Sequence, residues 1–386
     1  MKSVAFVTHI LTHYRVRFHE LVKENLEEAG IKYRLLYSDP KGTAAEKGDT
    51  VELDWAEKIP SKQLRILGKE IILQSYLDRT KDVDLLVIGQ ENRLIANYAA
   101  IILGRLRKRP VAFFGHGKNF QAAGKKPLAE AWKRRWSNTV QWWFTYTDGC
   151  ASIVEQNGFP KEFITVVNNS IDLNAIKSEI NAVPSQVRES LRADMLRGSR
   201  NVAVYVGGIY KEKRIPFLIE AAKVIRASVP DFQLLVIGSG PDAGLVAEAA
   251  AAYPWIHHAG PKFGIEKTEL VLTAKVWLMP GLVGLAVLDS FAYGVPIVTT
   301  DLPYHSPEFE YLTDGVNGVV VHDSQSTSEY ARAVVDLLDN EQHRAALIRG
   351  ASEALKAYSI EKMAARFASG AERALRGDPE RGDGAD

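Results

Sequence analysis

Residues 276–299 hold the chain's best candidate for a phosphate site. An apolar run at 276–279 leads into the loop Pro280-Gly281-Leu282-Val283-Gly284, and helical spacing follows at 285–293. A second apolar run at 296–299 completes a strand, loop, helix and strand unit. Glycine lets the backbone approach a ligand, and the first amides of a helix are free to bind an anion. Gly284 would let the backbone approach the ligand and the free amides of Leu285 and Ala286 would face it, so the pattern predicts a phosphate site.

Two more glycine turns follow apolar runs, at 201–206 and 233–237. Lys213 and Arg214 come shortly after the first of these turns and could reach a diphosphate. Neither turn has the G-x-G-x-x-G spacing, so a dinucleotide fingerprint is missing. The glycines of the two turns are Gly207, Gly208, Gly238 and Gly240.

Polar residues also follow apolar runs in the first half of the chain, where loops at the carboxyl edge of a parallel sheet bind ligands. His9 follows the first run, and His116 lies between two glycines after the run at 111–114. His116 is either functional or a turn histidine that hydrogen-bonds to the backbone. Glu91 and Asn92 could bind acceptor hydroxyls or could cap the helix expected from Arg93.

The segment Lys118 to Phe144 is basic and aromatic, with four of the seven tryptophans of the chain. Leu128, Trp132, Trp136 and Val140 recur every four residues, as on one face of a helix. Tryptophan beside basic residues is typical of contact with an anionic membrane surface. A helix whose apolar face packs in the core and whose basic face is solvated fits the pattern equally well. The candidate membrane contacts are Trp132, Lys133, Arg134, Arg135 and Trp136.

Asp82 and Asp84 have the Asp-x-Asp spacing that can hold a divalent ion. They precede the apolar run at 85–88 and so fall at the amino end of a strand, away from the ligand edge. A solvated turn is the favoured interpretation. No metal site is predicted.

The whole composition limits the classes of protein that fit. Forty-eight basic and 47 acidic residues leave a net charge of +1, which gives no global attraction to nucleic acid. The single cysteine excludes an internal disulfide framework. The N-terminus lacks a secretory signal and no apolar run approaches 20 residues, so we expect a cytoplasmic protein.

Alternating strands and helices in both halves predict an α/β protein with two helix-flanked parallel sheets. Residues 1–172 are expected to form the first domain and residues 201–358 the second. Charged, helical residues 173–200 would link them, and a helix at 359–375 would cross back to the first domain. Residues 376–386 have no apolar anchor and are expected to be disordered.

The order of these motifs resembles the retaining glycosyltransferase family four, of the GT-B fold. The resemblance rests on VYVGGIYKEKRIPFLIEA, LLVIGSGP, VLDSFAYGVPIVTTD and DGVNGVVV in the second half, and on VVNNSID and GHG before them. It implies two Rossmann-like, doubly wound domains that face a central cleft. The implied activity is transfer of a hexose from a nucleotide-diphosphate donor, with retention and without an obligatory metal or other cofactor.

The resemblance also implies roles for individual residues. Lys213, Gly284 and Leu285 would hold the diphosphate, and Asp289 would accept hydrogen bonds from the ribose. His116 would lie near the transferred sugar, which makes it the candidate catalytic residue. The other acceptor-side candidates are His9, Glu91, Asn92, Lys118 and Asn119.

Two positions depart from the family pattern. Gly281 replaces the first glutamate of the motif Glu, seven residues, Glu, while Asp289 replaces the second. Gly208 stands where an arginine usually follows the first glycine. Two alternatives therefore stay open: a non-catalytic subunit that binds sugar nucleotides, and a GT-B-like sugar-nucleotide epimerase.

The expected partners of an active transferase are a nucleotide sugar and a lipid-linked or saccharide acceptor, in the assembly of surface polysaccharide or glycolipid. Nucleic acid is not expected as a partner. The basic tryptophan segment would place the protein on the anionic inner face of the plasma membrane.

Overall fold

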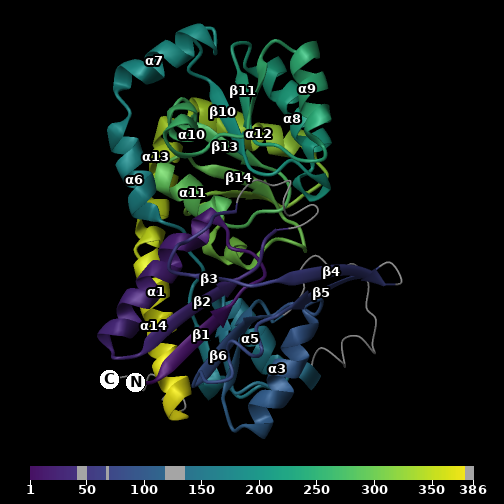
Figure 1. Ribbon diagram of the computed structural model, residues 1–386. Helices are drawn as coiled ribbons and strands as arrows, with labels where there is room; N and C mark the ends of the chain where they lie inside the picture. Colours follow the sequence, from purple (N-terminus) through teal and green to yellow (C-terminus); the bar gives the residue numbers. More distant parts are fainter. Residues whose placement is uncertain (41–49, 67–68, 118–134, 379–386) are drawn as a thin grey trace. The chain divides into compact units, whose positions relative to one another are not determined.

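The computed structural model describes residues 1–40, 50–66, 69–117 and 135–378 (Figure 1). The chain divides into two compact units, one of Met1–Ile171 with Ile360–Asp386 and one of Asp172–Ser359. Each unit is built on its own parallel sheet. The predicted α/β architecture with two Rossmann-like sheets is confirmed.

The sheet of the first unit has seven strands in the order β3-β2-β1-β6-β7-β8-β9. All its neighbouring strands are parallel, so their carboxyl ends meet at one edge. The strands are β1 (Ser3–Val7), β2 (Lys32–Tyr37), β3 (Glu57–Lys58), β6 (Leu85–Gly89), β7 (Val111–Gly115), β8 (Trp142–Thr145) and β9 (Ile164–Val166).

Alternate residues of these strands enter two separate hydrophobic cores. Phe6, Phe114 and Phe144 point to the face that carries α1 (Val16–Glu28) and α14 (Ile360–Arg376). Phe113 and Trp143 point to the face that carries α3 (Ile95–Leu106) and α5 (Asp148–Gln156). A parallel sheet covered on both faces needs such strands, buried on both sides.

Helix α14 belongs to the first unit although it comes last in the chain. It packs along α1, as Figure 1 shows, and buries Ile360, Met363, Ala364 and Phe367 at helical spacing. A third sheet, the antiparallel pair of β4 (Ser61–Ile66) and β5 (Lys69–Gln74), adds a hairpin that the sequence analysis did not predict.

The sheet of the second unit has six parallel strands in the order β12-β11-β10-β13-β14-β15. They are β10 (Val202–Val206), β11 (Gln233–Ile237), β12 (Ile256–Gly260), β13 (Val276–Met279), β14 (Ile297–Thr300) and β15 (Val319–Val321). The order changes direction at β10 and β13, and in open α/β sheets ligands bind at the carboxyl edge beside such a switch point.

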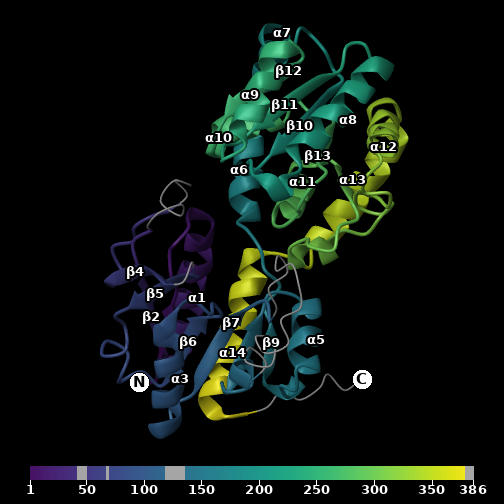
Figure 2. The same cartoon turned by 90° about the vertical axis from the view of Figure 1, so that its right-hand side faces the viewer.

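The helices that follow β10 in this unit are α8 (Ile215–Ser228), α9 (Ala243–Ala252), α10 (Gly264–Val271), α11 (Ala286–Tyr293), α12 (Thr327–Asp339) and α13 (Glu341–Leu355). Helix α12 packs along α8, as Figure 2 shows, and α13 packs on α11. In the described residues, no helix is both long and apolar enough to cross a membrane.

Residues 173–200, expected to link the domains, form α6 (Leu173–Ala182) and α7 (Ser185–Asp194) within the second unit. Helix α6 packs on α10 and α11, and the Thr268 hydroxyl donates to the carboxylate of Glu179 at 2.6 Å. Side-chain contacts with distant helices thus hold the segment in the unit, and sequence spacing does not reveal them.

Candidate functional site

The two glycine turns after β10 and β11 pack against each other at the carboxyl edge of the second sheet. A β-carbon on Gly238 would lie 1.9 Å from the carbonyl oxygen of Gly207, and one on Gly240 would lie 2.2 Å from that of Ile209. Gly207, Gly238 and Gly240 also have φ angles of 151°, 151° and 154°. Only glycine fits both the space and the backbone conformation.

Lys213 ends the short 3₁₀ helix η3 (Lys211–Lys213) and reaches the loop after β13. Its Nζ donates a hydrogen bond of 2.5 Å to the carbonyl oxygen of Leu282. The side chain is 7% exposed, and this burial lowers the pKa of Lys213 to about 8. The Lys213 ammonium therefore lies beside the glycine loop at 280–284.

Gly281 is the point where this loop touches η3. A β-carbon on Gly281 would lie 2.4 Å from the carbonyl carbon of Lys213 and 2.4 Å from the carbonyl oxygen of Glu212. The N–H of Leu282 donates to that same Glu212 oxygen at 2.9 Å. A side chain at position 281 would therefore clash with backbone that already occupies the space.

Arg214 lies next to Lys213 in the left-handed conformation, with φ of 57°. Its guanidinium donates to the Pro280 carbonyl oxygen at 3.3 Å and to the Thr300 hydroxyl at 3.1 Å. These bonds join η3 to the carboxyl ends of β13 and β14. Arg214 thus has protein partners in the place where the sequence analysis expected a diphosphate.

His305 holds the glycine loop by a hydrogen bond, and the sequence analysis did not identify this residue. The Val283 N–H donates to its Nδ1 at 3.0 Å, so the opposite nitrogen, Nε2, carries the proton and donates to the Thr300 carbonyl oxygen at 2.8 Å. Burial lowers the pKa of His305 and favours this neutral form. No local motif could have revealed His305, because 22 residues separate it from Val283.

The amides of Gly284 and Leu285 begin the turn into α11. Among the described residues, neither N–H donates to a protein acceptor. Leu285 is the N-cap of the helix, so both groups lie at its positive end. An anion could accept hydrogen bonds from both amides near the Lys213 ammonium.

Asp289, on the first turn of α11, is held by an ion pair. Lys267 of α10 donates to its Oδ1 at 3.2 Å, and the two side chains are 20% and 24% exposed. Burial disfavours the charged ammonium, but the charge of Asp289 and its hydrogen bond, together with Tyr293 and Glu179, outweigh burial and raise the pKa of Lys267. Any ribose at Asp289 would share its carboxylate with Lys267.

In the first unit, His116 follows β7 and its ring lies edge-on to Tyr146, with 4.3 Å between centroids. The Arg15 guanidinium lies 5.3 Å from the same tyrosine ring. Burial and then the charge of Arg15 lower the pKa of His116 to about 4, so the imidazole is neutral at pH 7. Arg15, which sequence spacing did not single out, thus adds to the effect of burial on the pKa of His116.

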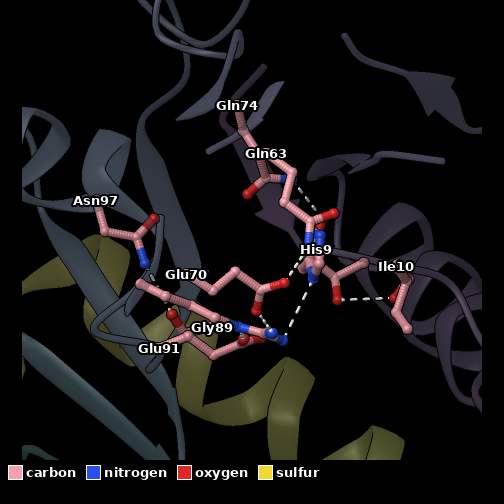
Figure 3. A network of polar contacts seen from close by, with 10 residues as sticks. His9, Ile10, Gln63, Glu70, Gln74, Gly89, Glu91 and Asn97 are labelled. Atoms are coloured by element: carbon pink, nitrogen blue, oxygen red, sulfur yellow. Dashed lines mark hydrogen bonds and ion pairs between the residues drawn. The ribbon is translucent and has the colours of Figure 1, made fainter. Parts of the chain in front are cut away.

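His9 and Glu91 belong to a polar network near the ends of β1 and β6 (Figure 3), in which both contact Arg93. Arg93 pairs with Glu91 at 2.8 Å and Glu70 at 2.5 Å, and its Nη2 lies 3.5 Å from Nδ1 of His9. Glu91 is therefore tied to Arg93. The alternative that Glu91 or Asn92 caps the helix is wrong, because α3 begins at Ile95 and its N-cap residue makes no side-chain cap bond.

Several candidates fall outside the described residues: Lys118, Asn119, Trp132, Lys133 and Arg134. Arg135 is exposed, whereas Trp136 is half-buried and packs edge-on against Tyr98 at 4.7 Å. The predicted helical stripe is wrong at Val140, which lies in a bend, because strand β8 begins at Trp142.

Trp142 and Trp143 lie in β8 and are 1% and 0% exposed, so both are core residues. Asp84 accepts hydrogen bonds from the N–H and hydroxyl of Ser3 at 2.7 and 2.9 Å. These bonds fix the amino ends of β1 and β6. They agree with the interpretation of Asp82 and Asp84 as a turn.

Residues 187–354 match the family described as glycosyl transferases group 1. The chain is 27% identical over 166 residues to a phosphatidyl-myo-inositol mannosyltransferase of Mycobacterium leprae, covering 42% of this chain and 43% of that protein. It is 26% identical over 223 residues to a D-inositol 3-phosphate glycosyltransferase of Paenarthrobacter aurescens, covering 55% and 52%. The chain thus spans about half the length of these relatives.

Among solved structures, HepE of Anabaena in complex with UDP and glucose has a TM-score of 0.70 and 12% identity. The match covers 96% of this chain and 100% of that chain. At this identity the likeness establishes the fold, which is GT-B, as the resemblance implied.

Proposed function

Because residues 187–354 form a glycosyl transferases group 1 domain, we propose that the protein transfers a hexose from a nucleotide-diphosphate sugar to an acceptor, with retained configuration. The observation that carries this proposal is the bond from Lys213 to the Leu282 carbonyl. It places a buried ammonium at a loop whose Gly284 and Leu285 amides have no protein acceptor in the described chain. This is a donor set for a diphosphate.

In the proposed reaction, the bond between the sugar and the diphosphate breaks and negative charge grows on the leaving phosphate. Lys213 and the two amides stabilise that charge, and they are already in place before the reaction begins. His305 keeps the loop in position by accepting from Val283. Asp289 binds the ribose hydroxyls beside Lys267.

On the acceptor side, His116 is the proposed catalytic residue. A neutral imidazole can accept a hydrogen bond from an acceptor hydroxyl, and burial beside Arg15 keeps His116 neutral. Lys118, Asn119, His9 and Glu91 remain the proposed acceptor contacts. Asn92 is exposed and stays in this group.

The proposed acceptor is a lipid-linked or saccharide molecule in glycolipid or polysaccharide assembly. The names of the two bacterial relatives, one acting on phosphatidyl-myo-inositol, support this acceptor class. We place the protein in the cytoplasm, on the inner membrane face, with exposed Arg135 among its contacts. The reaction is proposed to need no metal, so a chelator should leave the transfer rate unchanged.

A thermal-shift screen of nucleotide sugars, followed by assay of nucleoside diphosphate release, tests this function. The UDP complex of HepE makes UDP-sugars the first donors to try. A donor at about 100 times its dissociation constant should stabilise the protein by roughly 2.7 kcal/mol. No shift with any donor, together with no release, would contradict the proposal.

One observation favours a second function, a non-catalytic sugar-nucleotide-binding subunit. Gly281 removes the carboxylate that the family places near the donor sugar, and the Lys213 backbone leaves no space for one. Donor binding without release or transfer, for every acceptor class tried, would establish this function. Interconversion of the free nucleotide sugar without transfer would instead identify an epimerase.

A further inference from the structure

A cavity of about 730 Å³ opens at the amino ends of β7 and β8 in the first unit. It lies between the end of α3, the residues before β8 and the end of α14. Trp142 and Phe159 contribute aromatic surface to its wall. Its volume is in the range of sites that bind small molecules.

The charged residues of the cavity are all cationic. Arg105, Lys108, Arg109 and Arg376 line it, and no aspartate or glutamate is among the described residues that do so. Arg376 pairs with Glu372 at 3.0 Å, while Arg105 and Lys108 are exposed. The cavity therefore concentrates positive charge in a concave, partly apolar surface, which attracts anions.

Arg109 is the deepest of these cations, with 8% of its surface exposed. One guanidinium nitrogen donates to the Thr80 carbonyl oxygen, but Nε has no hydrogen-bond partner in the described chain. Asp82 acts on this charge electrostatically but makes no ion pair with it in the described chain, so an anion in the cavity would lower the cost of burying the guanidinium. Arginine suits phosphate because its planar donors match two phosphate oxygens.

Asn138 supplies a different kind of group. Its amide nitrogen donates to the Asn157 carbonyl oxygen at 2.8 Å, whereas its buried Oδ1 has no donor in the described chain. A ligand with a hydroxyl group beside its phosphate would satisfy both this acceptor and Arg109. The two atoms without partners, Nε of Arg109 and Oδ1 of Asn138, therefore favour a hydroxyl-bearing phosphate ester as the ligand.

The cavity is separate from the candidate acceptor residues. Arg109 precedes β7 and His116 follows it, so the length of the strand, roughly 15 Å, lies between them. Leu106, 76% exposed, and Ile102, 51% exposed, lie on α3 next to Arg105. These apolar residues give a lipid bearing the phosphate a surface for its acyl chains.

We infer that this cavity, built around Arg109 and Asn138, binds a hydroxyl-bearing phosphate ester, either free or as the headgroup of an anionic lipid. The site is independent of the proposed donor site and does not require the proposed transferase activity.

Titration calorimetry on the full chain with glycerol 3-phosphate tests the site, and co-sedimentation with phosphatidylcholine vesicles, with and without phosphatidylglycerol, tests the lipid source. The double variant Arg105→Gln/Lys108→Gln should weaken binding about tenfold or more. Lys62→Gln/Arg65→Gln removes the same charge from exposed residues outside the cavity and should leave binding unchanged. Lys213→Met should also leave it unchanged, because Lys213 belongs to the donor loops.

Saturable binding of glycerol 3-phosphate with weak vesicle binding would identify a free ligand, and the reverse would identify a lipid. If both double variants weaken binding equally, the binding comes from general charge attraction and not from the cavity, and the inference is overturned. Loss of glycerol 3-phosphate binding in Lys213→Met would show that the phosphate binds at the donor loops, which would overturn the inference. Absence of saturable binding to either probe would also overturn it.

Discussion

Gly281 packs its α-carbon directly on the backbone of Lys213, where a β-carbon would lie 2.5 Å from the Lys213 α-carbon. Real β-carbons do not approach backbone this closely, so the loop after β13 and the helix η3 meet only because residue 281 has no side chain. This contact brings the Lys213 ammonium to the Leu282 carbonyl. It also leaves no space for a side chain at position 281.

Replacing Gly281 with alanine or glutamate should therefore lower the free energy of unfolding of the second unit. Overpacking against backbone costs about 1–3 kcal/mol or more. Donor-induced thermal shifts should shrink with it, because Lys213 moves away from the loop. Gly244→Ala is the matched control, since a β-carbon at this position on α9 meets nothing within 4 Å and alanine favours helix. Unchanged stability of Gly281→Glu would contradict the steric explanation.

The Lys213 pKa of about 8 predicts a pH dependence of donor binding. Diphosphate prefers the protonated ammonium, so affinity should fall as pH rises above about 8, and binding near that pH should take up a proton. Calorimetry in buffers of different ionisation enthalpy measures this uptake, which Lys213→Met should abolish.

The lowered pKa of Lys213 affects the stability of the free protein in the opposite direction from donor affinity. Between pH 8 and the ordinary lysine pKa of 10.5, the unfolded chain binds more protons at this residue than the folded one. The contribution of Lys213 to the free energy of unfolding should therefore rise with pH across that window. A wild-type curve that matches the Lys213→Met curve would contradict the assigned pKa.

Asp289→Asn separates recognition of ribose from recognition of phosphate. If Asp289 binds the ribose hydroxyls, the variant should bind a nucleoside diphosphate about tenfold more weakly, because a hydrogen bond to a charged group contributes about 1.5–3 kcal/mol. Binding of inorganic pyrophosphate should stay unchanged. Lys267→Met is the companion variant, because it removes the ion pair and keeps Asp289. Equal losses of affinity for nucleoside diphosphate and for pyrophosphate in Asp289→Asn would indicate a structural role for the ion pair.

His116→Ala should lower the transfer rate by about 100-fold or more while donor-induced thermal shifts stay unchanged. The pKa of about 4 also predicts that the wild-type rate has no inflection near pH 6.5 that depends on His116. His322→Ala, at a side chain 76% exposed in the second unit, is the control. Full activity of His116→Ala would remove it from the catalytic site.

His305→Ala should cost about 1–3 kcal/mol of unfolding free energy, because the buried Val283 N–H loses its acceptor. Burial lowers the pKa of His305, so the unfolded chain binds the proton more readily and stability should fall as pH drops below 6.5. Thermal unfolding of wild type and variant across pH 4–7 measures this. A wild-type acid limb identical to that of His305→Ala would contradict the role of the neutral ring.

Sequence by itself determined the alternation of strands and helices, the glycine turns and the presence of Lys213 near one of them. These features depend on local spacing, burial periodicity and the conformational freedom of glycine, all of which can be read along the chain. It also placed the last helix as one that crosses back. The short strand β8, Trp142 to Thr145, was missed because most of its residues lie within the basic aromatic segment Lys118 to Phe144.

Tertiary structure alone decided which distant residues meet. Lys267 reaches Asp289 from another helix, His305 supports Val283 from 22 residues away, and Arg15 acts on His116 from the first strand's loop. The requirement for glycine at 281 likewise comes from backbone that lies 68 residues earlier, at Lys213. Such contacts depend on how loops from different strands converge at a sheet edge, and no local spacing in the sequence records that convergence.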